Sequence, residues 1–278
     1  MLTGHERDMV FRHAYIPEHL PEYVQAVSLS EPHIHEGYLC YFDGSTLIII
    51  GYPLEAEPAA VTGEEIHHVL DSACARFRPA SVSIIAPLLP TDDRMTVHGN
   101  DTYFRLDMPL VTGGPEQAYM VRRAARELTV LEGVFGKEHQ ALVETFIGER
   151  DLSAGHGEIF RSLPRYLNGS STARLLEARK GQALAAFTIL DLGSAEYGFY
   201  LFNFRSRVIH VPGASDLLFH RMAHLAAEAG KRRLNLGLGV NPGIRRFKEK
   251  WGATPFLPHV WATMHRKRPG FLNALWGR

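Results

Sequence analysis

The sequence predicts an α/β (α+β) protein in which mixed sheets are flanked by helices and two related units follow one another. Three observations predict it. Strand-like runs joined by glycine turns occupy the first and last parts of the chain, a helical stretch lies between them, and apolar residues recur at helical spacing within each part. The 278 residues, 45% of them hydrophobic and 22% charged, are an ordinary composition for two globular domains.

The first strand-rich part contains a hairpin signal and a capped helix. Asp43-Gly44 separates two apolar runs, as in a tight hairpin. Thr62 and Glu65 have the spacing of a capping box and predict the start of a helix. The expected order is strand, strand, helix, strand and strand, over residues 38–42, 46–52, 63–78, 81–86 and 102–108.

The last part has the clearest alternation of strands and helices. Strands are expected over 173–178, 183–192, 196–204, 233–237 and 254–265, and helices over 215–229 and 243–251. Gly230 is the expected C-terminal cap of the longer helix. We therefore divide the chain into a first unit (1–112), a helical connector (113–170) and a second unit (171–278), with the first unit a degenerate repeat of the second.

Charge is divided unevenly along the chain. Residues 1–204 contain 16 Lys and Arg against 27 Asp and Glu, whereas residues 205–278 contain 14 against 3. The basic last quarter indicates an anionic neighbour, which is a phosphorylated cofactor, a nucleic acid, an anionic lipid or the acidic rest of the chain. The two cysteines and the absence of a long apolar run at the N-terminus predict a cytoplasmic protein without a transmembrane segment.

A loop of small residues enters the longer helix of the last part. Val211, Pro212, Gly213, Ala214 and Ser215 precede its first turn, whose backbone N–H groups have no helical acceptor and favour an anion. Gly213 allows a phosphate to approach the backbone closely. A second interpretation stays open, in which Ser215 and Asp216 only cap the helix.

The last part resembles the GNAT acyltransferase core, and more specifically the second half of tandem-GNAT proteins such as Fem-type aminoacyltransferases and the phosphatidylglycerol lysyltransferase catalytic domain. The resemblance covers the C-terminal ~100 residues, the size of one domain, and reaches residues 1–110 only through their architecture. The matching features are Pro212-Gly213-Ala214-Ser215, the helix end at Gly230, Leu234-Asn235-Leu236-Gly237, Gly243-Ile244, Phe247-Lys248 and Trp251-Gly252-Ala253.

This resemblance implies an N-acyltransferase that moves an acyl or aminoacyl group from acyl-CoA or aminoacyl-tRNA to an amine on a small molecule or peptide, with tRNA a candidate partner. The donor would contact the residues of the loop, the backbone near Phe204, and Lys248. The loop departs from the usual GNAT pattern because it has one glycine and an acidic Asp216, so both donors stay open. The alternative function is a non-catalytic binding protein that retains the fold.

The resemblance also implies that the strands over 196–204 and 233–237 splay apart around the acyl arm. Tyr200, Asn203 and Asn241 are the polar catalytic candidates beside them, and no carboxylate stands out as the general base. No metal site is expected, because the histidine pairs lack a third ligand at a recognised spacing. Glycines 237, 239 and 243 depart from a dinucleotide fingerprint in their spacing.

Overall fold

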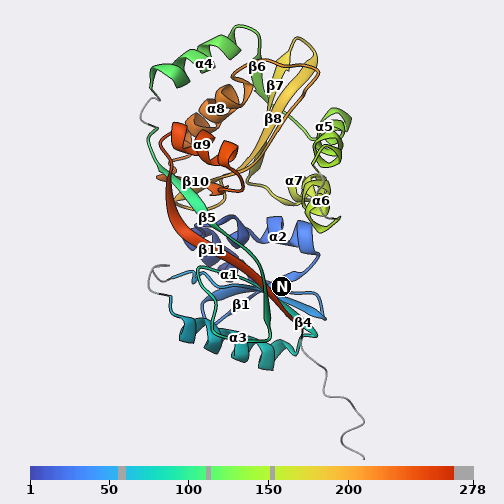
Figure 1. Ribbon diagram of the computed structural model, residues 1–278, viewed down its shortest axis with the longest axis vertical. Helices are drawn as coiled ribbons and strands as arrows, with labels where there is room; N and C mark the ends of the chain where they lie inside the picture. The colour runs from blue at the N-terminus through green and yellow to red at the C-terminus, as the bar shows by residue number, and fades with distance from the viewer. Residues whose placement is uncertain (56–60, 111–113, 151–153, 266–278) are drawn as a thin grey trace, which may run out of the picture. The chain divides into compact units, whose positions relative to one another are not determined.

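The computed structural model describes residues 1–55, 61–110, 114–150 and 154–265 (Figure 1). Backbone contacts divide them into two compact units that interleave along the chain. Unit 1 contains Met1–Glu6, Leu29–Thr102 and the chain from Leu257, and unit 2 contains Arg7–Ser28 and Tyr103–Phe256. The division of the chain into consecutive domains at residues 112 and 170 stays a prediction.

Unit 1 is a mixed sheet with one long helix. Its strand order is β1-β2-β3-β4-β11-β5. The pairs β1–β2, β2–β3 and β4–β11 are antiparallel, and the pair β3–β4, which the helix α3 connects, is parallel. The elements are β1 (Glu31–His35), β2 (Tyr38–Phe42), β3 (Thr46–Ile50), α3 (Gly63–Phe77), β4 (Ser81–Ala86), the first part of β5 (Met95–Asp107) and the last part of β11 (Thr254–His265).

Unit 2 repeats this arrangement with more helices. Its strand order is β6-β7-β8-β9-β10-β5, and the helix α8 connects the parallel pair β9 and β10. The helices are α1 (Gly4–His13), η1 (Pro17–His19), α2 (Pro21–Ser28), α4 (Pro115–Ala125), α5 (Lys137–Gly148), α6 (Ala154–Arg161), α7 (Leu163–Gly169), α8 (Ala214–Glu228) and α9 (Pro242–Lys250). The strands are the end of β5, β6 (Thr129–Glu132), β7 (Ala173–Lys180), β8 (Ala183–Asp191), β9 (Tyr197–Arg205) and β10 (Arg233–Leu238).

The two units exchange their final strands. In unit 1, the strand that follows α3 is β4, and it pairs with a strand from the second half of the sequence. In unit 2, the strand that follows α8 is β10, and it pairs with a strand from the first half. Residues Val260–His265 of β11 pair with β4 in unit 1, and residues Tyr103–Asp107 of β5 pair with β10 in unit 2. The sequence had predicted that the 254–265 strand shares a sheet with the other strands of the last part, and β11 does lie in the same continuous sheet as β7–β10. Its pairing with β4, from the first part of the chain, was not predicted. Strand periodicity determines which residues face a core but not which neighbour a strand pairs with.

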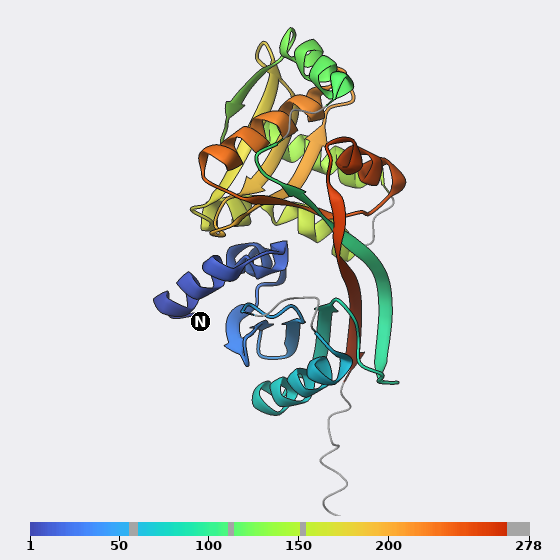
Figure 2. The same ribbon diagram turned by 90° about the vertical axis from the view of Figure 1, so that its left-hand side faces the viewer.

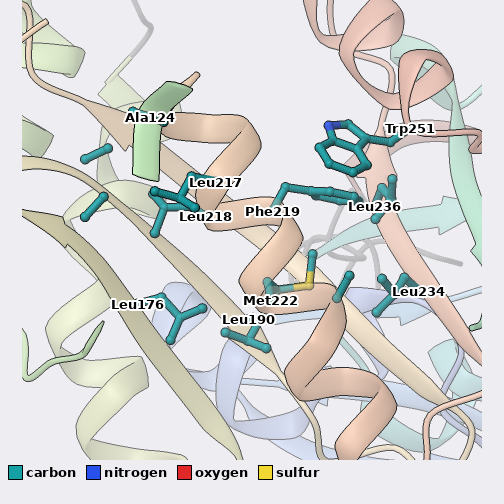
Figure 3. Packing of buried hydrophobic residues seen from close by; sticks show 14 of the residues in the cluster. Ala124, Leu176, Leu190, Leu217, Leu218, Phe219, Met222, Leu234, Leu236 and Trp251 are labelled. Atoms are coloured by element: carbon teal, nitrogen blue, oxygen red, sulfur yellow. The ribbon is translucent and has the colours of Figure 1, made fainter. Parts of the chain in front are cut away.

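The core of unit 2 lies on both faces of its sheet. On one face, α8 buries Leu218, Phe219 and Met222 against β7, β8 and β10, and α4 and α9 cover the same cluster (Figure 3). On the other face, α2, α5 and α7 pack against Phe187 and Phe204. Figure 2 shows helices on both sides of this sheet. Sheets covered on both faces read as nearly continuous apolar runs, which explains the sequence of β8.

Local turn and cap signals are confirmed by the structure. Asp43 accepts hydrogen bonds from the backbone of Ser45 and Thr46 in the β2–β3 hairpin. The Thr62 side chain accepts from the Glu65 N–H at the start of α3, and Gly230, at φ +71°, follows α8. The strand β6 was missed, because it is short and lies within a stretch read as helical.

Candidate active site

The parallel strands β9 and β10 pair only at their beginnings. Arg233, Leu234 and Asn235 align with Tyr197, Gly198 and Phe199, and the pairing ends there although β9 continues to Arg205 and β10 to Leu238. The backbone of β9 after Phe199 therefore has no strand partner on this side among the described residues. The resemblance to the GNAT core implies that the acyl arm of a donor lies between these two strands.

A bulge in β10 causes this separation. The register of β10 against β5 shifts between Asn235 and Leu238, and Gly237 takes a φ of +72° that glycine adopts without strain. The Asn235 side chain holds the bulge, since its Oδ1 accepts from the Gly237 N–H at 2.7 Å and its Nδ2 donates to the Tyr15 carbonyl at 2.8 Å. Asn235 is fully buried, so this bond pattern fixes the point where the strands part.

The loop before α8 lies under the helix α4. Gly213 has a φ of +85°, and a Cβ placed on it would lie 2.5 Å from the Met120 carbonyl oxygen and 3.4 Å from the Ala124 Cβ. Val211 and Ala214 are buried in the same core cluster. Gly213 is therefore needed for close packing of α4, a contact that the sequence does not reveal. The role of residues 211–215 in donor binding stays a prediction.

Asp216 occupies the first turn of α8 and is already engaged. Its Oδ1 accepts from the Trp251 Nε1 at 3.1 Å and lies 2.5 Å from the Lys250 Nζ, and the residue is only 6% exposed. This contact ties the end of α9 to the start of α8. A fixed carboxylate there opposes a phosphate at the same helix end, because like charges repel strongly where water is excluded.

Two predicted site residues of β9 lie on the α8 face beyond the point of separation. The Ser215 Oγ donates to the Asn203 Oδ1 at 2.8 Å, while the buried Asn203 Nδ2 has no hydrogen-bond partner among the described residues. Tyr200 packs edge-on to Phe219, with ring centroids 5.5 Å apart. Burial, and after it the charge of Asp216, raises the pKa of the Tyr200 hydroxyl, so this group stays protonated.

The other predicted residues are placed differently. Asn241 is the N-cap of α9, where its Oδ1 accepts from the Ile244 N–H at 3.0 Å. The Phe204 side chain stacks on Phe187 in the core of the opposite face. Lys248 is 3% exposed, and its Nζ donates to the Leu238 carbonyl at 2.5 Å, next to the β10 bulge.

A partly buried acid on the opposite face could not be identified from the sequence. The Tyr103 hydroxyl donates to the Glu18 Oε2 at 2.8 Å, and burial raises the pKa of Glu18. The segment from Tyr15 to Tyr23 reaches both parted strands: the Tyr15 carbonyl accepts from Asn235 of β10, and the Tyr23 ring lies 6.0 Å from that of Phe202 of β9. Glu18 is part of a short 3-10 turn without a recognisable motif, so its position could be found only in three dimensions.

Within the described ranges, no group of three His, Cys, Asp or Glu side chains could hold a metal ion, and no helix is long and apolar enough to cross a membrane.

No family model matches this sequence, and no curated protein matches it. Solved structures do match. FemX has a TM-score of 0.61 at 12% identity, covering 94% of this chain and 96% of its own. L-PGS from Bacillus licheniformis has a TM-score of 0.56 at 14% identity, covering 96% and 93%. A tandem GNAT protein from the clavulanic acid biosynthesis pathway has a TM-score of 0.55 at 14% identity, covering 95% of each chain. The fold is therefore a tandem GNAT-like fold, as the sequence predicted.

Proposed function

We propose that the protein is an N-acyltransferase in which an amine attacks an acyl or aminoacyl donor directly. The observation that supports this most is the separation of β9 and β10 after Asn235. It leaves backbone N–H and C=O groups of β9 available to hold a donor in line with an acceptor. Direct transfer needs this positioning, together with a donor of hydrogen bonds for the oxyanion.

Lys248 is the cation best situated for the oxyanion. Its buried Nζ lies beside the bulge, and a Cβ on Gly237 would be 3.9 Å from it and 3.8 Å from the Tyr200 carbonyl oxygen. The Lys248 Nζ and the Tyr200 carbonyl oxygen therefore both lie near Gly237, where β10 separates from β9. A buried ammonium stabilises a developing negative charge more than one in water does.

The residues around α8 favour aminoacyl-tRNA over acyl-CoA as the donor. Asp216 and the packing of α4 on Gly213 oppose a pyrophosphate at the start of α8. Exposed arginines lie on the helices beside it, Arg122 and Arg123 on α4 and Arg245 and Arg246 on α9. Such a basic surface suits the phosphates of a nucleic acid, and its binding would weaken steeply with salt.

The test measures transfer of a labelled group to n-butylamine. The wild-type protein is incubated with a mixture of labelled aminoacyl-tRNAs or with labelled acetyl-CoA, and the amide product is quantified. We expect transfer from aminoacyl-tRNA, and we expect Lys248→Met to lower kcat about 100-fold, the loss typical of one oxyanion donor. Lys231→Met is the matched control, because the Lys231 Nζ also donates to a backbone carbonyl, that of Ser194.

The alternative, a binding protein that retains the fold, predicts a different result. Donor binding without any turnover by the folded wild-type protein would refute the enzyme. Transfer from acetyl-CoA but not from aminoacyl-tRNA would instead refute our choice of donor. In the expected case, Arg246→Glu should weaken tRNA binding at low salt and matter less as salt is raised.

A further inference from the structure

We propose that Glu18 and Tyr103 form the site for the acceptor amine, and that the Glu18 carboxylate binds the ammonium group and takes its proton. This inference rests on the proposed function for the chemical step, and its binding part can be tested independently. It also identifies the acceptor class as a primary amine that arrives protonated.

The two faces of the sheet separate donor from acceptor. Side chains alternate along a strand, so Tyr103 and Phe104 of β5 point to opposite faces. Phe104 belongs to the α8 core cluster, and the Lys248 Nζ lies 5.5 Å from its ring centroid. Tyr103 therefore points to the other face, where its hydroxyl holds Glu18. Lys248 and Glu18 thus flank the parted strands from opposite faces.

Glu18 belongs to a segment that contacts both β9 and β10 near the point where these two strands separate. It stands in sequence between Tyr15, which accepts from Asn235 of β10, and Tyr23, whose ring packs near Phe202 of β9. Its hydrogen-bond partner Tyr103 aligns with Leu238, the last residue of β10. The chain on either side of Glu18 therefore contacts β10 at its last paired residue and β9 beyond its own.

The surroundings suit a cationic ligand. Glu18, Tyr23 and Phe202 all keep part of their surface accessible to solvent, although they lie among buried residues. Burial, and after it the charge of Glu18, raises the pKa of the Tyr23 hydroxyl, so Tyr23 stays neutral beside an ammonium ligand. A carboxylate beside aromatic rings is the combination that binds alkylammonium ions. A buried carboxylate also has a raised pKa, which makes it a stronger base.

The proposed step is balanced as follows. An ammonium proton moves to a Glu18 carboxylate oxygen, and the freed nitrogen lone pair attacks the donor carbonyl carbon. The C–N bond forms, the oxyanion collapses, and the bond from carbon to the ester oxygen of the donor breaks. The second nitrogen proton ends on that leaving oxygen, and Glu18 releases its proton to solvent. No oxidant or other reactant is needed.

The binding experiment uses n-butylammonium as the probe, titrated into the full-length protein at pH 8 and followed by NMR. We expect Glu18→Gln to weaken binding at least 10-fold, while n-butanol binds neither protein measurably. Glu65→Gln is the matched control, because the Glu65 Oε1 accepts from a tyrosine hydroxyl, that of Tyr38, in unit 1. Equal binding by the wild type and Glu18→Gln would overturn the proposal whatever the activity.

The kinetic experiment distinguishes a role of Glu18 in removing the acceptor's proton from a role in maintaining the structure. With n-butylamine as acceptor, Glu18→Ala should lower kcat at least 100-fold, leave the KM for the donor unchanged, and recover part of its rate when formate is added. Hydroxylamine, which is unprotonated at pH 8, should be far less affected. Equal losses of kcat with n-butylamine and hydroxylamine would refute the role of Glu18 as the base. If the ammonium site is confirmed but the wild type transfers no group, the proposed function fails and the binding site stands.

The variant Tyr103→Phe distinguishes a binding role of Glu18 from a purely structural one. This variant keeps the ring and removes only the O–H that holds Glu18. We expect it to weaken n-butylammonium binding less than Glu18→Gln does, with an unchanged melting temperature. If Tyr103→Phe binds the probe as the wild type does and only Glu18→Gln unfolds the protein, Glu18 is structural and the proposal fails.

Discussion

Replacing Gly213 by alanine tests whether this glycine serves the packing of α4 or only the turn before α8. The added Cβ would lie 2.5 Å from the Met120 carbonyl oxygen, closer than real Cβ atoms come, and the obstacle is backbone. The helix α4 must therefore shift, and with it Ala124, which is fully buried against α8.

The expected loss has two parts. A non-glycine residue at φ +85° costs about 1 kcal/mol in backbone strain. Overpacking against a fixed neighbour costs about 1–3 kcal/mol more. Gly213→Ala should therefore lose about 2–4 kcal/mol of unfolding free energy, whereas a mere surface loop would lose only the first part.

Gly230 supplies the control at the other end of the same helix. It has a φ of +71°, and a Cβ there would meet nothing within 4 Å. Gly230→Ala should cost about 1 kcal/mol from strain alone. Urea unfolding of both variants, followed by circular dichroism, gives the difference. Equal losses would refute the argument that Gly213 is required by α4.

Two further predictions concern unit 2. Asn241→Ala should lose about 1 kcal/mol of unfolding free energy because the N-cap of α9 is removed. The control Asn100→Ala, on the exposed part of β5, should change the unfolding free energy by less than about 0.5 kcal/mol. A large loss of transfer activity at unchanged stability would mean instead that Asn241 is catalytic. Burial, opposed by Glu177, lowers the pKa of His139, so the unfolded chain binds a proton at higher pH than the folded protein does, and stability should be lost as the pH falls below about 6.5. Melting temperatures of His139→Gln should fall less between pH 7.5 and 5.5 than those of the wild type, while those of His67→Gln, a change at a partly exposed histidine, should follow the wild type. Parallel curves for all three proteins would exclude His139 as the cause.

The sequence by itself determined the local elements and the fold class. The capping box at Thr62, the Asp43-Gly44 turn and Gly230 act within a few residues of themselves, so their consequences could be read directly. The order of strands and helices in the last part, together with the resemblance, predicted the tandem GNAT-like fold.

Only the tertiary structure decided how distant segments meet. The exchange of β5 and β11 depends on pairing between residues that are far apart in sequence, which side-chain periodicity does not encode. The same holds at the site. The close approach of the Met120 carbonyl to Gly213 could not be predicted from the sequence, where this glycine indicated a phosphate-binding loop or a helix cap. Glu18 carried no motif, since it meets Tyr103 across 85 residues of chain. A buried carboxylate is defined by what surrounds it, and those neighbours come together only when the chain folds.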